Sequence, residues 1–348
     1  MERGVFMVAT MELDGGAWAS LVVTAISFSA GVALSPVAIF VARTLDIVDK
    51  PNGKLKRHAE PVAYLGGLVL CLASVLALEF IGQNPVDLLG KGVVAGALAL
   101  LVLGTIDDKF GLSARFKLLV QLLICPLVAY TLIGDVAATG WFWVVAASAW
   151  LVLIANAFNI LDVANGLAAS VAATAAVFIA LLGFYAGNVA VALIGTALVG
   201  AVFAFLLFNF PRARMFLGDG GSLFLGFMLG VLCIKLGVGT KRLEDWAAAG
   251  LVLAVPVLDV LLVSLCRWRR GIPIMQGSRD HLAHRLGAIG LTCVQLVLVA
   301  VAGTGLLGIL AVLVFGQAQG YTWICAGSLV VLMVFLGDRL ARLPRPHS

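Results

Sequence analysis

The stretch GVVAGALALLVLGTIDDKFGL, residues 92–112, indicates the class of fold, because an apolar run leads directly into two adjacent carboxylates. The run from Gly92 to Ile106 is long enough for a helix that lies mostly inside a membrane. Asp107 and Asp108 carry like charges side by side, and such a pair suits a bound cation or a proton acceptor. An ordinary turn at the membrane surface is the alternative, since aspartates are tolerated there. The other loops must decide between these two interpretations.

The whole chain shares this apolar character. Of its 348 residues, 62% are hydrophobic and only 12% are charged. So little polar surface is typical of an integral membrane protein, and the apolar segments are too long for the alternating strands of a membrane barrel. We therefore predict an all-α, polytopic membrane helix bundle that forms a single domain over residues 1–348. The six cysteines show neither zinc-binding nor disulfide spacing.

Eleven segments have the length and composition of membrane-spanning helices. An alternative joins the sixth and seventh segments into one span that is broken near Gly183 and Gly187. The eleven predicted spans are residues 18–41, 62–82, 92–106, 116–133, 141–157, 167–186, 189–208, 222–236, 246–266, 291–315 and 321–337.

The positive charges predict the orientation. Most of the 23 lysines and arginines fall in the loops after odd-numbered spans and in the C-terminal tail. By the positive-inside rule these loops and the C-terminus are cytoplasmic, and the N-terminus is outside. All loops with chemically interesting residues then lie on one face. A transporter would more naturally place its ionisable residues near the bilayer midplane, whereas an enzyme acting on a membrane lipid and a soluble substrate needs this arrangement.

The first cytoplasmic loop contains a basic cluster that includes Lys50, Lys54 and His58. Such a cluster can bind phosphates, but charge alone favours a topogenic patch or a patch for lipid headgroups. In the second loop Lys117 and Gln121 share one helical face, and both are also compatible with a simple interfacial position.

The third cytoplasmic loop, residues 156–170, repeats a polar side chain every third residue in an apolar context. Polar groups at this depth are costly without partners, so the spacing favours ligand binding over a simple turn at the Asn–Gly pair. The four residues are Asn156, Asn159, Asp162 and Asn165.

The fourth loop places Asp219 among three glycines, directly before a helix expected to begin at Ser222. Glycines let the backbone approach a phosphate, and a helix N-terminus favours an anion. Asp219 as a cap of that helix is the alternative.

The fifth loop holds His281 and His284 beside Arg279 and Asp280. No further ligands complete a zinc site, so contact with a pyrophosphate fits better. Asp259, within the ninth span, is either functional or paired inside the protein.

Taken together, these loops resemble the polyprenyl-phosphate N-acetylhexosamine-1-phosphate transferases. The resemblance extends from Leu45 to Leu286 and keeps the order and spacing of the family's motifs. The motifs are DKPNGKLKRH with PVAYLGG, GTIDDKFGL, NAFNILD, FLGDGGSLFLG, and VPVLD followed by RDHLAHRL.

The resemblance implies a Mg²⁺-dependent reaction, with Mn²⁺ as the alternative ion. The phosphate of undecaprenyl phosphate would attack the sugar-linked phosphorus of a UDP-N-acetylhexosamine and release UMP. Asp219 and Asp107 are the implied metal ligands, and the implied catalytic residues are Asp107, Asp108, His281 and His284. The implied substrate-binding residues are Lys50, Lys54, His58, Lys117, Asn156, Asn159, Asp162, Asn165 and Arg279.

Two positions depart from the usual family pattern. Val163 replaces a glycine after Asp162, which affects the expected contacts to uridine or sugar, and Ala283 replaces one histidine of the His motif. The metal-site carboxylates are kept. The first loop favours transfer of GlcNAc-1-phosphate over transfer of phospho-MurNAc-pentapeptide, and a membrane transporter or a silent lipid-phosphate binder is the alternative from another class. We expect a location in the bacterial inner membrane, contact with membrane lipids and no nucleic-acid partner, while a homodimer stays open.

Overall fold

The computed structural model describes residues 2–49, 61–134, 140–273, 280–317 and 319–343. Within these ranges nearly all residues are helical, which confirms the predicted all-α class. The elements are α1 (Glu2–Thr44), β1 (Val48–Asp49), β2 (Val62–Ala63), α2 (Gly66–Phe80), α3 (Pro85–Leu89), α4 (Lys91–Phe110), α5 (Ala114–Ile133), α6 (Trp141–Leu161), α7 (Leu167–Tyr185), α8 (Val189–Asn209), α9 (Gly218–Thr240), α10 (Leu243–Leu251), α11 (Ala254–Arg269), α12 (Leu282–Ala288), α13 (Cys293–Val314) and α14 (Gln319–Ala341).

The long apolar helices of the described residues give a count of membrane spans. In the described part of the chain eight helices are long and apolar enough to cross a membrane, and α10 with α11 would make a ninth. Helix α2 has only 15 residues, and α4 carries charged residues at both of its ends. The count of eleven therefore stays a prediction.

The predicted ninth span is wrong as a single helix. It is divided into α10 and α11, which are bent by 74° relative to each other. Gly250 and Pro256 flank the break, and a proline in the first turn of α11 requires no lost hydrogen bond. The predicted sixth and seventh spans are separate helices, because α7 ends at Tyr185 and α8 begins at Val189.

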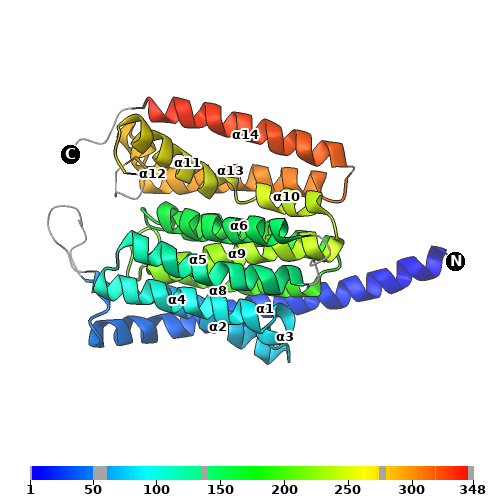
Figure 1. The fold of residues 1–348 in the computed structure, drawn as a ribbon. Helices are drawn as coiled ribbons and strands as arrows, with labels where there is room; N and C mark the ends of the chain where they lie inside the picture. The colour runs from blue at the N-terminus through cyan, green and yellow to red at the C-terminus, as the bar shows by residue number, and fades with distance from the viewer. Residues whose placement is uncertain (1, 50–60, 135–139, 274–279, 318, 344–348) are drawn as a thin grey trace.

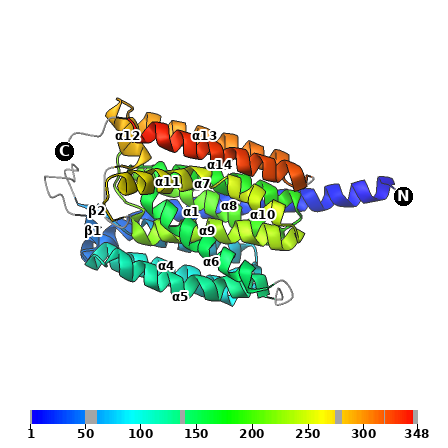
Figure 2. The same cartoon turned by 45° about the horizontal axis from the view of Figure 1, so that its top comes forward.

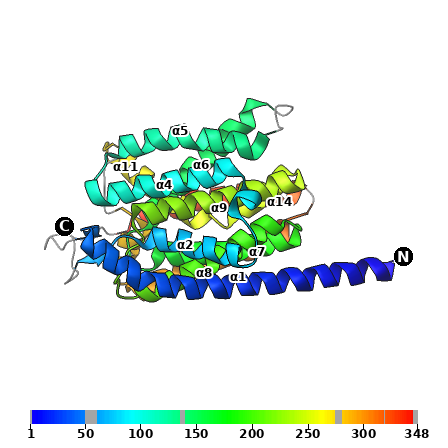
Figure 3. The same cartoon turned by 90° about the horizontal axis from the view of Figure 1, so that it is seen from below.

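Helix α9 lies inside the bundle and positions the candidate site. It packs against α4 and α6 and also touches α2, α7 and α10 (Figures 1 and 3). Most of this helix is covered by its neighbours, and 78% of its most apolar window is buried. Helix α14, by contrast, presents most of its apolar surface outward, as expected for contact with lipid.

A short antiparallel pair joins the first loop to the start of α9. In this pair, β1 and β2 align Val48 with Ala63. The carbonyl of Ala63 then accepts the N–H of Phe216 at 2.7 Å. These bonds hold the segment before α2 against the segment before α9, at the end of the bundle where α12 also lies (Figure 2).

The first and last long helices begin and end on opposite sides of the bundle. Figure 1 shows the start of α1 at one end and the last turn of α14 at the other. This is the arrangement expected when the two termini lie on opposite membrane faces. Which end faces the cytoplasm stays a prediction, as does the single domain.

Candidate active site

Helices α4 and α9 meet backbone to backbone at a pair of glycines. A Cβ atom at Gly104 would lie 2.3 Å from the backbone nitrogen of Gly220, and one at Gly220 would lie 2.6 Å from Thr105 Oγ1. Only glycine permits this approach. The contact places the last turn of α4, which holds Asp107 and Asp108, beside the first turn of α9.

Asp108 caps the N-terminus of α9 from the neighbouring helix. Its Oδ1 accepts the backbone N–H of Asp219 at 2.8 Å, and its Oδ2 accepts that of Gly220 at 3.3 Å. Gly218, at φ +73°, has no room for a side chain because a Cβ there would lie 2.4 Å from Asp108 Oδ2. The alternative that Asp219 is the cap is therefore wrong, and the helix begins at Gly218 rather than at Ser222.

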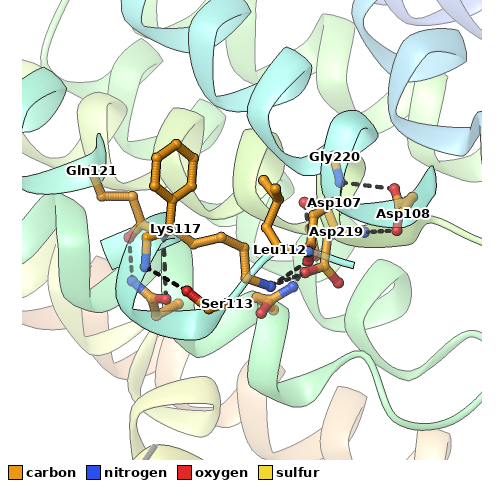
Figure 4. Close-up of polar contacts among 12 residues, drawn as sticks. Asp107, Asp108, Leu112, Ser113, Lys117, Gln121, Asp219 and Gly220 are labelled. Atoms are coloured by element: carbon orange, nitrogen blue, oxygen red, sulfur yellow. Dashed lines mark hydrogen bonds and ion pairs between the residues drawn. The ribbon is translucent and has the colours of Figure 1, made fainter. Parts of the chain in front are cut away.

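Lys117 joins the other two carboxylates. Its Nζ lies 2.5 Å from Asp107 Oδ2 and also donates to Asp219 Oδ2 (Figure 4). The second oxygen of Asp107 accepts the backbone N–H of Leu112, which follows the left-handed Gly111 at the end of α4. One ammonium group from the start of α5 thus holds together carboxylates from α4 and α9.

Burial and neighbouring carboxylates raise the pKa values of several groups around this cluster. Burial, and then the carboxylate of Asp219, raise the pKa of Asp108 to about 8. The same two causes raise the pKa of Asp162 to about 7. Burial and the nearby Asp108 also raise the pKa of the Tyr64 hydroxyl to about 12. Asp107 and Asp219 share the single ammonium group of Lys117, so the cluster favours an additional cation.

The four polar residues predicted to share one loop are divided between a helix and a turn. Asn156 and Asn159 lie within α6, and Asp162 ends that helix. The Asn159 amide donates to Ser222 Oγ on α9 at 3.0 Å. Placing Asn156 and Asn159 in a loop was wrong, because the apolar pattern of the span continues through them to Leu161.

Gln121 and Asn165 take part in contacts that link elements. The side chains of Gln121 on α5 and Asn156 on α6 hydrogen-bond to each other. The Asn165 amide donates to the carbonyl of Pro211 at 3.1 Å. Nearby, Asn209 Oδ1 accepts the N–H of Gly166, so the two loops at this end of α7 and α8 support each other.

His281 and His284 lie at the start of α12 and form a second polar group. Their ring centroids are 5.5 Å apart. Asp259 on α11, which is fully buried, contacts His281 Nδ1 through Oδ2 at 3.2 Å and accepts the Leu282 N–H through Oδ1 at 2.5 Å. Figure 1 shows α12 at the same end of the bundle as the start of α9.

A buried ion pair supports this second group. Arg285 lies 2.8 Å from Asp280 Oδ1 and is almost fully buried. Its guanidinium also donates to three backbone carbonyls at the C-terminal end of α14. These are the carbonyls of Leu340 and Ala341, in the last turn, and of Leu343, just beyond it. Arg285 therefore fixes α12 to α14.

The structure brings together only part of the predicted set. Lys117, Asp107, Asp108 and Asp219 form one contact network, and the histidine pair forms another. Tyr64 was missed, although it stands in the PVAYLGG segment two residues before a pair of glycines, and so was Ser222. Four predicted residues, Lys50, Lys54, His58 and Arg279, lie outside the described residues.

The carboxylates of Asp107 and Asp219 fit a magnesium ion by their chemistry. Mg²⁺ usually takes one or two carboxylates and completes its shell with water and substrate phosphates. In the part of the chain that the structure describes, no three acidic, His or Cys residues group as a complete metal site. A shared site with few protein ligands is therefore the form that these residues suit. Both oxygens of Asp108 are already engaged by backbone N–H groups.

Comparisons with known proteins find similar transferases. The profile of glycosyl transferase family 4 matches residues 91–237, from the first residue of α4 to near the end of α9. A probable undecaprenyl-phosphate N-acetylglucosaminyl 1-phosphate transferase of Bacillus subtilis is 27% identical over 87% of this chain and 86% of its own. A decaprenyl-phosphate N-acetylglucosaminephosphotransferase of Mycobacterium tuberculosis is 30% identical over 79% of this chain and 77% of its own. An undecaprenyl-phosphate alpha-N-acetylglucosaminyl 1-phosphate transferase of Salmonella typhi is 24% identical over 78% of this chain and 79% of its own.

Proposed function

The chain belongs to glycosyl transferase family 4, and from this membership we propose that it transfers N-acetylglucosamine 1-phosphate from a UDP-sugar to undecaprenyl phosphate. The protein is a multi-pass membrane transferase. We place the reaction at the cytoplasmic face of the bacterial inner membrane, where the basic loops are expected to lie. The products are UMP and a lipid-linked diphosphate sugar that starts a cell-envelope glycan.

The cluster of Asp107, Lys117 and Asp219 carries this proposal. Phosphoryl transfer depends mainly on positioning and on neutralising the charge of the phosphates. Two carboxylates that share one ammonium group offer both an anionic site for a cation and a lysine that can turn toward a substrate phosphate. These features support transfer between two phosphorylated substrates.

The side chains suggest separate tasks. Asp219 and Asp107 would hold Mg²⁺, which neutralises diphosphate charge when bound. Asp107 Oδ2, once Lys117 turns to a phosphate, can accept a proton from the lipid phosphate. Asp108 keeps the start of α9 in place, because both of its oxygens bind backbone N–H groups. Asn159 and Asp162, at the end of α6, would contact the nucleotide sugar, as the resemblance to the family's motifs implies.

The reaction can be tested directly with purified protein. We would supply undecaprenyl phosphate, Mg²⁺ and a panel of radiolabelled UDP-sugars that includes UDP-GlcNAc and UDP-MurNAc-pentapeptide. Release of UMP and a lipid-linked product with UDP-GlcNAc is expected. A product with UDP-MurNAc-pentapeptide alone would support the peptidoglycan alternative, and no turnover with any UDP-sugar would refute the transferase.

The metal role needs its own variant. Asp219→Asn should abolish the Mg²⁺-dependent turnover while the protein stays monodisperse in detergent. The matched control is Asp87→Asn, which makes the same change on α3, away from the cluster, and should keep wild-type turnover. Wild-type activity of Asp219→Asn would refute the assigned metal ligand.

A further inference from the structure

Asp259 is an acidic residue with no exposed surface on a helix of the membrane bundle. An ionisable group is costly in such a place, so it is retained only where a partner and a role compensate for the burial. Two of its hydrogen bonds go to the start of α12. One reaches the ring of His281 and the other reaches the backbone N–H of Leu282.

Asp259 and Asp280, the two buried aspartates around the start of α12, have different partners. Asp280 pairs with the guanidinium groups of Arg285 and Arg270, so its charge is balanced by two cations. Asp259 contacts an imidazole, and the guanidinium of Arg267 on the same helix is near enough to feel its charge. Asp280 therefore stabilises the fold around α12, whereas Asp259 is bound to a side chain that is chemically active at neutral pH.

The contact fixes the position of a hydrogen on the ring. A carboxylate accepts hydrogen bonds, so the tautomer that satisfies this contact with Asp259 carries its hydrogen on His281 Nδ1. Among the described residues Nε2 has no hydrogen-bond partner, and the ring as a whole is mostly buried. With Nδ1–H held, the imidazole can take up or release a proton at Nε2 only.

We propose that Asp259 is a positioning residue of the transfer reaction, which holds the hydrogen of His281 on Nδ1 so that proton exchange with the substrate phosphates takes place at Nε2. This inference rests on the proposed function and on the expectation from the sequence that the histidine pair contacts a pyrophosphate. It assigns to Asp259 an action through His281 and no contact of its own with substrate. It also explains why a carboxylate is kept inside the bundle.

The variant Asp259→Asn separates this role from simple burial. Asparagine has nearly the same shape but only one acceptor atom, and the buried N–H of Leu282 requires it. The amide NH₂ then faces His281 Nδ1, and the ring must move its hydrogen to Nε2. We expect kcat to fall on the order of 100-fold, with little change in the KM for the UDP-sugar.

A matched control makes the same change in another buried acid. Asp245 on α10 is also buried and accepts a backbone N–H, that of Gly316, at 2.9 Å. It contacts Arg242 and no histidine among the described residues. Asp245→Asn should keep the wild-type kcat in the folded fraction. An equal loss of kcat in both variants would overturn the proposal.

A double variant tests whether Asp259 acts through the ring. If it does, Asp259→Asn should cause no further loss of kcat in a protein that already carries His281→Gln. A merely structural role would multiply the two losses, and that outcome would overturn the proposal.

Nitrogen-15 NMR of histidine-labelled protein reads the tautomer without any turnover. The His281 resonances are assigned as those missing from His281→Gln. We expect a protonated Nδ1 in the wild type and an unprotonated Nδ1 in Asp259→Asn. An unprotonated Nδ1 in the wild type would overturn the proposal. Absence of turnover with every UDP-sugar would instead refute the proposed function, and the NMR measurement would still show which ring nitrogen carries the hydrogen.

Discussion

Asp108 on α4 accepts the backbone N–H of Asp219 on α9 at 2.8 Å, so the first aspartate fixes the main chain that carries the second. The two residues are separated by 111 positions in sequence. A carboxylate at a helix N-terminus satisfies unpaired N–H groups and interacts favourably with the helix dipole. The candidate metal ligand is thereby held in place from a different helix.

Asp108→Asn should lower thermal stability more than Asp107→Asn. Asparagine at 108 offers one acceptor for two backbone N–H groups, and an unsatisfied buried N–H costs about 1–3 kcal/mol. Asp107 loses mainly its ion pair with Lys117. The midpoints of thermal unfolding in one detergent provide the comparison, and a smaller decrease for Asp108→Asn would contradict the capping role.

Lys117→Met should increase the stabilisation that Mg²⁺ gives to the protein. Without the ammonium group, Asp107 and Asp219 repel each other, and a divalent cation relieves this repulsion more than it does in the wild type. Turnover should fall on the order of 100-fold because a phosphate-neutralising group is lost. The readout is the melting temperature against Mg²⁺ concentration.

The control for Lys117 is Lys109→Met. Lys109 is exposed on α4 and lies over the ring of Phe110, so its removal changes the net charge equally without touching the cluster. It should show the wild-type response to Mg²⁺. An identical response of both variants would indicate a general effect of surface charge.

Gly104→Ala should push α4 and α9 apart. The added methyl group would overlap the backbone of Gly220, and overpacking of this kind costs about 1–3 kcal/mol. Turnover should fall as well, since Asp107 and Asp219 lie on the two separated helices. Gly305→Ala on α13 is the matched control, because a Cβ added there would meet no atom within 4 Å and stability should not decrease.

Asp162→Asn should remove part of the pH dependence of stability. Because the folded-state pKa of Asp162, about 7, lies above its ordinary value of 3.8, the folded protein binds more protons than the unfolded protein between these pH values. Stability therefore decreases as the pH rises through this window. In EDTA the melting temperature of the wild type should fall more between pH 5 and pH 8 than that of the variant. Parallel curves of melting temperature against pH would contradict this.

Much of the bundle could be predicted from hydropathy alone. The predicted span 116–133 differs from α5 by two residues, and 189–208 differs from α8 by one. The break between α10 and α11 could not be placed, since the sequence stays apolar across Val252 and Leu253 and the bend depends on packing. Helix boundaries at Asn156 and Asp107 were missed because polar residues there continue a helix instead of ending it.

The contacts of the site were less predictable than its residues. The motif order brought Asp107, Asp108 and Asp219 into consideration, but no local pattern shows that one of them caps a distant helix. The partner of Asp259 was left open in the sequence, because pairing across 22 positions depends on how α12 folds back onto α11. Side-chain spacing identifies candidates, and only tertiary packing divides their tasks.

The bonds from Arg285 to the carbonyls of Leu340, Ala341 and Leu343 have a practical consequence for handling the protein. Through these bonds the end of α14 supports α12, which contains His284 and begins directly after His281. A fusion partner or purification tag attached close to Leu343 would strain that support and disturb the histidine pair. Tags for kinetic work are better attached at the N-terminal side, far from this end of the bundle (Figure 1).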